Sequence, residues 1–218
     1  TETEISPDQY YNSQPSFSPD GQKIIFLSAR KDLNLDGRID QSELPGLYMK
    51  DLATGREECL VEPEHRPKFP SFSPNGQSII LASWHYQSRV CGIYLLDLKT
   101  RLGRTLQGRF ECNFPTFSPS GDRIIYSSWR QDTNRDGVID LRDNSALYQM
   151  HLKTERETIL VSDQFSNSYP KFSPSGDTIL YLSRRRDTNR DGAVNSLDNS
   201  GIYTLHLSKQ KEKMVVSD

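Results

Sequence analysis

The chain lacks the motifs that mark common hydrolases and the apolar segments that mark membrane proteins. Its 218 residues contain no G-x-S-x-G nucleophile elbow and no H-E-x-x-H zinc motif, and its four histidines are scattered along the sequence. The chain has no run of 18 apolar residues, the length that a membrane-spanning helix needs, and it has no basic segment followed by an apolar one as in a leader peptide. We therefore expect a soluble protein that has no membrane span and is not itself an enzyme.

Cysteine and surplus charge are also scarce. There are three cysteines, so at least one thiol is free, and a chain of this length buries about 70% of its unfolded surface without needing disulfides. The 27 basic and 29 acidic residues give a formal net charge of −2. The basic run from Arg184 to Arg186 is too short for the stripe that nucleic acids require, so no nucleic-acid partner is expected.

What the chain does contain is a fourfold repeat. The segment Pro-x-Phe-Ser-Pro-x-Gly occurs at 15–21, 70–76, 115–121 and 170–176, and an apolar stretch such as Ile24 to Leu27 follows each copy. The Ser-Pro-x-Gly tetrapeptide favours a tight turn, because proline presets one backbone angle and glycine accepts a positive φ. Each repeat is therefore predicted to contain a hairpin.

Two further strands complete each repeat. The third holds a tyrosine at the same place every time (Tyr48, Tyr94, Tyr148, Tyr203), and a short apolar fourth segment follows. Four strands in a repeat of this length are typical of a propeller blade. We predict an all-β fold, a β-propeller of four-stranded antiparallel blades, as a single domain over 1–218. The predicted blades cover 15–61, 70–106, 115–161 and 170–216, and 1–6 forms an additional segment like a fourth strand. Both a closed four-blade ring and a part of a larger propeller are compatible with this pattern.

Two motifs of the repeat carry a family resemblance. Phe-Ser-Pro-Asp-Gly at 17–21 precedes an apolar strand, and Leu-Tyr-x-x-Asp-Leu-x-Thr-Gly follows at 47–55. The chain resembles the TolB-type propellers, whose repeat also occurs in the gating domains of prolyl-oligopeptidase-like enzymes. The resemblance implies a propeller fold and a habit of binding other molecules. Such propellers usually have six or more blades, and long acidic insertions are not general among them.

Three of the four repeats carry such an insertion, at 32–43, 132–143 and 187–198. Each fits D-x-N-x-D-G-x-Φ-[DN]-x-x-[DE], where Φ is apolar, and this spacing of oxygen-bearing side chains around a glycine is that of an EF-hand calcium loop. The segments that follow, such as Leu47 to Leu52, are short and strand-like, so EF-hand and dockerin helices are excluded and a calcium sensor is the least favoured function. We predict about three Ca²⁺ ions in loops inserted between β-strands.

The ligands follow from the loop positions. Backbone carbonyls are expected from Arg38, Val138 and Ala193, and side-chain oxygens from the remaining positions. The predicted side-chain ligands are Asp32, Asn34, Asp36, Asp40 and Glu43 in the first loop, Asp132, Asn134, Asp136, Asp140 and Asp143 in the second, and Asp187, Asn189, Asp191, Asn195 and Asp198 in the third. Only Glu43 has the length usual for a bidentate ligand at the last position, and the third loop should bind most weakly. The second repeat has no acid in 84–92 and should bind no metal.

The segments that enter each first strand should share an edge with these loops, and they carry aromatic and basic residues of the kind that anchor interfaces. The candidates are Tyr10, Tyr11, His65, Arg66, Arg109, Phe110 and Phe165. We predict a calcium-stabilised binding module for a protein or glycan partner, possible as a homo-oligomer or as part of a larger chain, in the periplasm or secreted. The alternative is the substrate-gating propeller of a larger hydrolase or peptidase.

Overall fold

The computed structural model describes residues 9–85, 90–190, 192, 194 and 198–216. Among them are sixteen strands in four antiparallel sheets, and a one-turn 3-10 helix, η1 (Pro63–His65), joins the first sheet to the second. In each sheet the strands lie side by side in chain order. The all-β architecture predicted from the repeat is confirmed, and we call the sheets blades 1 to 4.

The blades begin a few residues before the Pro-x-Phe-Ser-Pro-x-Gly motifs. Blade 1 contains β1 (Tyr11–Phe17), β2 (Lys23–Ala29), β3 (Gly46–Asp51) and β4 (Glu57–Val61). Blade 2 contains β5 (Lys68–Phe72), β6 (Ser78–His85), β7 (Val90–Asp97) and β8 (Gly103–Gln107). Blade 3 contains β9 (Glu111–Phe117), β10 (Arg123–Trp129), β11 (Ala146–His151) and β12 (Glu157–Val161). Blade 4 contains β13 (Ser166–Phe172), β14 (Thr178–Arg184), β15 (Gly201–His206) and β16 (Lys211–Val216). The predicted extra segment at 1–6 lies outside the described residues.

The Ser-Pro-x-Gly turns close the first hairpin of every blade. In blade 1 the Gly21 amide donates to the Ser18 carbonyl at 2.9 Å, and the Ser18 hydroxyl accepts from the Lys23 amide at 2.9 Å. Gly21 has a φ of 70°, a left-handed conformation that a side chain would strain. The turn therefore fixes the register in which Phe17 pairs with Ile24.

Apolar side chains from neighbouring blades form three cores. Between blades 1 and 2, Ile25, Leu27 and Leu47 pack against Ile79 and Leu81. The other two boundaries repeat this arrangement, with Ile80 and Ile124 in one core and Ile125 and Ile179 in the other. Each blade is thus stabilised chiefly by burial of apolar area against the next blade.

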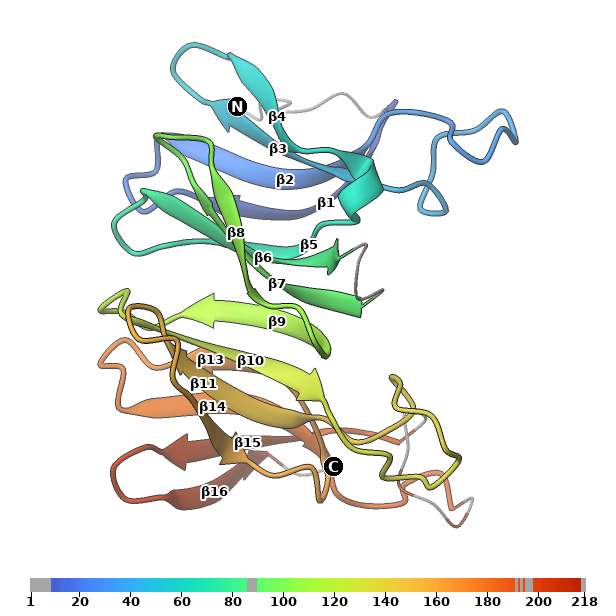
Figure 1. The fold of residues 1–218 in the computed structure, drawn as a ribbon, viewed down its shortest axis with the longest axis vertical. Helices are drawn as coiled ribbons and strands as arrows, with labels where there is room; N and C mark the ends of the chain where they lie inside the picture. Colours follow the sequence, from blue (N-terminus) through green and yellow to red (C-terminus); the bar gives the residue numbers. More distant parts are fainter. Residues whose placement is uncertain (1–8, 86–89, 191, 193, 195–197, 217–218) are drawn as a thin grey trace.

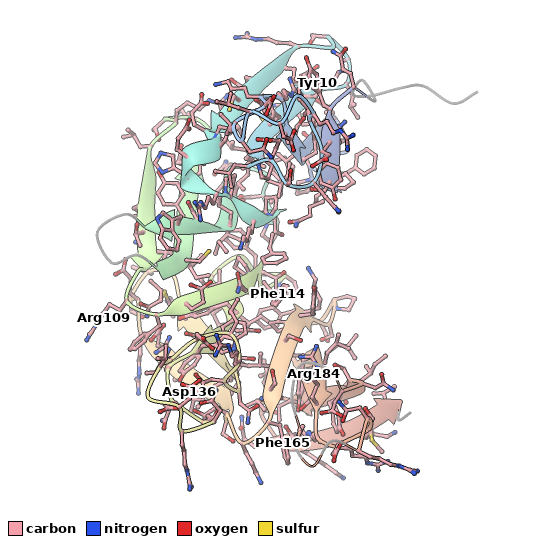
Figure 2. The ribbon with its side chains drawn as sticks, turned by 90° about the vertical axis from the view of Figure 1, so that its right-hand side faces the viewer. Tyr10, Arg109, Phe114, Asp136, Phe165 and Arg184 are labelled. Atoms are coloured by element: carbon pink, nitrogen blue, oxygen red, sulfur yellow. The ribbon has the colours of Figure 1, made fainter. Side chains whose placement is uncertain are left out.

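The blades form an open arc. Figure 1 shows blade 1 at the top of the long axis and blade 4 at the bottom, with the other two between them. After a quarter turn the sheets follow a curve, and Phe114 of β9 lies on its concave side (Figure 2). The Phe114 ring centroid is 4.2 Å from that of Phe69 and 3.8 Å from that of Tyr169, so the first strands of blades 2, 3 and 4 meet along this inner side.

No helix among the described residues has the length and apolar character needed to cross a membrane.

Candidate metal centres and the loop edge

The first acidic insertion links β2 to β3 and folds around its own carboxylates. The amides of Asp36 and Gly37 donate to the two carboxylate oxygens of Asp32 at 3.1 and 2.8 Å, and the Arg38 amide donates to Asp36 at 2.9 Å. One carboxylate oxygen from each of Asp32, Asp36 and Glu43 lies within 4.8 Å of the others. Three carboxylates so close together repel one another unless a cation or protons neutralise them.

The second insertion, between β10 and β11, repeats this geometry. The Asp136 and Gly137 amides donate to Asp132 at 3.1 and 2.9 Å, and the Val138 amide donates to Asp136 at 2.9 Å. In the third insertion, between β14 and β15, the Gly192 amide donates to Asp187 at 2.8 Å. The predicted ligands Asp191, Ala193 and Asn195 lie outside the described residues. The shared hydrogen bonds show that the first two loops match in backbone shape, and the described part of the third loop shares the bond from its glycine.

The last loop position has a role that its spacing did not reveal. Glu43, Asp143 and Asp198 are only 4%, 2% and 5% exposed. The Asp143 carboxylate accepts from the amides of Thr133 at 2.7 Å and Asp140 at 3.0 Å, and also from the Thr133 hydroxyl. Burial opposes its ionisation, but hydrogen bonds from backbone amides outweigh burial and hold the pKa of Asp143 below its usual value. Asp143 therefore ties the two ends of the loop together.

The first loop differs from the other two at this position. Glu43 accepts from the Leu33 amide at 2.8 Å, and its longer side chain belongs to the three-carboxylate group. Asp198 resembles Asp143, because it accepts from both the amide and the hydroxyl of Thr188. The second loop position is thus threonine where the last position is aspartate, and leucine where the last position is glutamate. Asp143 and Asp198 therefore tie their loops through a threonine, whereas Glu43 also belongs to a group of three carboxylates.

The ninth loop position is fixed by local hydrogen bonds. The Asp40 carboxylate accepts from the backbone amide and the hydroxyl of Ser42, and these bonds hold the pKa of Asp40 below its usual value. In the second loop the Arg142 amide donates to Asp140 at 2.7 Å, and the Arg142 guanidinium lies 3.7 Å from Asp136. An exposed arginine thus partly neutralises the second loop.

The loops and the first-strand entries share an edge of the arc, as predicted. Figure 1 shows the β2–β3 and β10–β11 loops projecting from the same side. The Ser145 hydroxyl donates to the Asn167 carbonyl at 2.6 Å, and the Asn144 amide group donates to the Gln164 carbonyl at 3.3 Å. The end of the second loop is therefore bound to the segment that enters blade 4.

Three of the predicted partner-binding aromatics contact an arginine within their own blade. The distance from the guanidinium carbon to the ring centroid is 4.8 Å for Arg30 and Tyr10, 4.7 Å for Arg130 and Phe110, and 5.1 Å for Arg185 and Phe165. Each guanidinium also stacks on a second ring, whose centroid is 3.7 Å away for Tyr48, 3.6 Å for Tyr148 and 3.9 Å for Tyr203. Each arginine pairs with a glutamate of the fourth strand, Glu57, Glu157 or Glu212. We call this arginine, its two rings and its glutamate the arginine clamp.

The clamp occurs in the three blades that carry acidic loops. Its arginine stands two residues before the first loop aspartate, as Arg130 stands before Asp132. In blade 2 the repeat places His65, His85 and Gly103 where the other blades have the first ring, the arginine and the glutamate. Alignment of the four repeats would have shown this joint loss, although no single segment contains the whole clamp.

The other predicted partner-binding residues have different surroundings. Arg66 lies over the Trp84 ring at 5.4 Å, and Arg109 lies 5.8 Å from the Phe110 ring centroid. Tyr11 is exposed on β1, and His65 ends η1. Figure 2 shows Arg109 directed away from the ribbon. These four residues leave a mixed aromatic and basic surface at the loop edge.

The fold is shared with several solved propellers. TolB from Acinetobacter baumannii superposes with a TM-score of 0.68 at 19% identity, over 97% of this chain and 45% of that protein. The chain has a TolB-like β-propeller fold. An oligogalacturonate lyase in complex with manganese gives a TM-score of 0.68 at 13% identity, over 97% of this chain and 55% of the lyase. A prolyl endopeptidase gives 0.64 at 13%, over 96% and 30%.

These TolB-like neighbours establish the fold and nothing finer, because their sequences have diverged so far. The chain spans about half or less of the length of the three proteins named. No protein-family model matches the sequence, and no curated protein matches it either.

Proposed function

We propose that this chain is a calcium-binding, calcium-stabilised propeller module that binds a protein or glycan partner and performs no catalysis of its own. The calcium proposal rests on one observation: the carboxylates of Asp32, Asp36 and Glu43 converge within a loop that has EF-hand spacing. A cation would neutralise these charges and join the three carboxylates directly, in addition to the hydrogen bonds that already tie the loop together.

The donor set fits a hard divalent cation. Carboxylate, amide and carbonyl oxygens are the ligands that Ca²⁺ prefers, and the first loop offers them from Asp32, Asn34, Asp36, Asp40 and Glu43 together with the carbonyl of Arg38. In the second loop Asp143 is saturated by backbone donors, so Asp132, Asn134, Asp136, Asp140 and the Val138 carbonyl would hold the ion. We therefore expect the first loop to bind more tightly than the second.

The binding role is supported by the fold and the loop edge. TolB-type propellers are binding proteins by family habit, and Tyr11, Arg66 and Arg109 are exposed at the entries to the first strands of blades 1, 2 and 3. Loops in which some ligand positions are not acidic bind calcium weakly, with an affinity that suits the millimolar calcium outside the cytoplasm. We therefore propose that the protein is periplasmic or secreted. The likeness to a prolyl endopeptidase keeps the gating propeller of a hydrolase as the second candidate.

Thermal unfolding with calcium and with chelator tests the calcium proposal. Calcium at a hundred times its dissociation constant stabilises the folded state by about 2.7 kcal/mol per site. For a chain of this size that corresponds to about 5 to 10 °C in Tm for one site. Titration calorimetry should give about three ions per chain, and magnesium at the same concentration should give a smaller shift. Identical Tm values in calcium and chelator would reject the proposal.

A further inference from the structure

A cavity of about 420 Å³ lies between blades 1 and 2 at the loop edge. The lining residues that matter here are Glu62, His65, Ser83, Trp84, Tyr94 and Thr105. Three of them, Ser83, Tyr94 and His65, align in the repeat with Ser128, Tyr148 and Phe110. Those three residues surround the clamp arginine of blade 3, since Arg130 donates to Ser128 at 3.1 Å and stacks on both rings. The cavity therefore occupies the place of an arginine clamp.

Blade 2 has lost the charged members of the clamp but kept part of its walls. A Cβ added at Gly103, the position of the clamp glutamate, would overlap the hydroxyl of Tyr94, so a glutamate there would require the Tyr94 ring to move. Leu81 replaces Tyr126, whose hydroxyl contacts Glu157 in blade 3. The tyrosine and the serine of the clamp remain.

The equivalent crevice between blades 3 and 4 shows what has changed. It measures about 380 Å³, and Leu160, Val161 and Phe165 line it as Leu60, Val61 and His65 line the cavity of blade 2. Its wall also contains Arg185 and Glu212, whose side chains pair at 3.2 Å. The cavity beside blade 2 shares these three wall positions and has no such arginine–glutamate pair among its described lining residues.

One acid appears at the rim of this cavity and not at the equivalent places. Glu62 aligns with Gly108 and Ser162 in the following repeats; the residue is exposed, and burial together with the nearby Glu62 carboxylate raises the pKa of the Cys59 thiol. The basic residues nearby are His65, which lines the cavity, and Arg66, whose guanidinium lies over Trp84. Tyr94 and Glu62 both line the cavity, and an aromatic ring together with a carboxylate is the combination that favours arginine.

We propose that this cavity binds the arginine side chain of a partner protein. The bound side chain takes the place of the arginine that the other three blades supply from their own second strand. The inference rests on the proposed role of the chain as a protein-binding module, and it does not depend on calcium. It names arginine as the anchor of the partner.

Two small probes separate charge from shape. N-acetyl-arginine amide and its neutral isostere N-acetyl-citrulline amide are titrated into the ¹⁵N-labelled chain while the two tryptophan indole resonances are followed. Trp84 lines the cavity, whereas Trp129 is 7% exposed and donates to the Asp143 carbonyl at 3.1 Å. We expect the arginine probe to shift the Trp84 resonance and not that of Trp129. The citrulline probe should bind about tenfold more weakly, because it lacks the cation–π and ionic contributions.

Three variants locate the site. Glu62→Gln should weaken the arginine probe about five- to tenfold by removing a charge-assisted contact. Glu64→Gln, an exposed acid two residues away that does not line the cavity, should leave affinity unchanged. Thr105→Trp places a large side chain from an exposed position into the cavity and should abolish binding, and circular dichroism checks that each variant is folded.

The outcomes divide cleanly. Equal affinity for the two probes, a shift confined to Trp129, undiminished binding by Thr105→Trp, or no binding at all would overturn the arginine site. The titrations are run both in calcium and in chelator. Arginine binding without any calcium effect on Tm would reject only the calcium proposal, and a calcium effect without arginine binding would reject only this one.

Discussion

Blades 2 and 3 are neighbours with the same four-stranded topology, yet one edge of each is built differently. Blade 3 carries an acidic loop between its second and third strands and an arginine clamp beneath it. Blade 2 carries neither, and its second and third strands extend to His85 and begin again at Val90. The core that joins the blades is unaffected, since Ile80 and Ile93 pack against Ile124 and Tyr126.

In the three blades that have them, the loop and the clamp are adjacent along the chain. The clamp joins the end of the second strand to the third and fourth strands and to the entry of the first, and the loop begins two residues after its arginine. Where the loop is lost, the clamp is lost with it. The apolar core between blades 2 and 3 therefore forms without a clamp in blade 2.

The largest expected effect comes from breaking the clamp of blade 3. Arg130 makes two hydrogen bonds to the Glu157 carboxylate, at 2.9 and 3.0 Å, and both side chains are mostly buried. Arg130→Met keeps the apolar stem but leaves Glu157 without its cation, so we expect a loss of about 3 kcal/mol in the free energy of unfolding. Urea denaturation in chelator measures this loss without any contribution from calcium.

Blade 4 provides the matched control for this variant. The Arg185–Glu212 pair is more exposed, so Arg185→Met should cost about 1 kcal/mol less than Arg130→Met. Equal losses for the two variants, or no loss for either, would contradict a clamp whose strength depends on burial.

A second effect separates the first loop from the others. Asp32→Ala removes one of the three converging carboxylates, and it should lower the calcium stoichiometry by one and remove up to about 2.7 kcal/mol of calcium-dependent stabilisation. Glu155→Ala removes an exposed acid from the turn between β11 and β12, and it should leave stoichiometry unchanged. Titration calorimetry on both variants gives the number of calcium ions bound per chain. An unchanged number for Asp32→Ala would mean that no ion is bound by the three carboxylates of the first loop.

The strands and loops could be predicted from the sequence because their signals are local. Pro-x-Phe-Ser-Pro-x-Gly sets a turn within seven residues, and the acidic motif lies within twelve. The arginine clamp could not be predicted in this way, because Phe110, Arg130, Tyr148 and Glu157 stand on four different segments. The burial of Asp143 was also missed, since spacing alone does not show which carboxylate faces backbone donors. The curvature that leaves the arc open depends on how whole blades pack, which no single motif encodes.

A smaller effect tests the loop ties of blades 3 and 4. The Thr133 hydroxyl donates to Asp143 and accepts from the Asn144 amide at 2.7 Å. Thr133→Val removes both contacts at nearly constant volume, and we expect a loss of about 1 kcal/mol together with weaker calcium binding in the second loop. Thr158→Val, on an exposed face of β12, is the control. An unchanged calcium titration would show that Asp143 keeps the loop closed without threonine.

The smallest effect concerns whether the loop-free edge of blade 2 stays closed. Cys91 is buried in β7, Cys112 lies in the core between blades 2 and 3, and Cys59 is exposed. Burial raises the pKa of both buried thiols to about 12, so almost no reactive thiolate is present there at pH 8. We expect a thiol reagent to label about one cysteine per native chain and all three in urea. Rapid labelling of Cys91 with Cys112 still protected would mean that blade 2 opens at the end where its second and third strands meet. That result would indicate that the clamp and the loop hold this end closed in the other three blades.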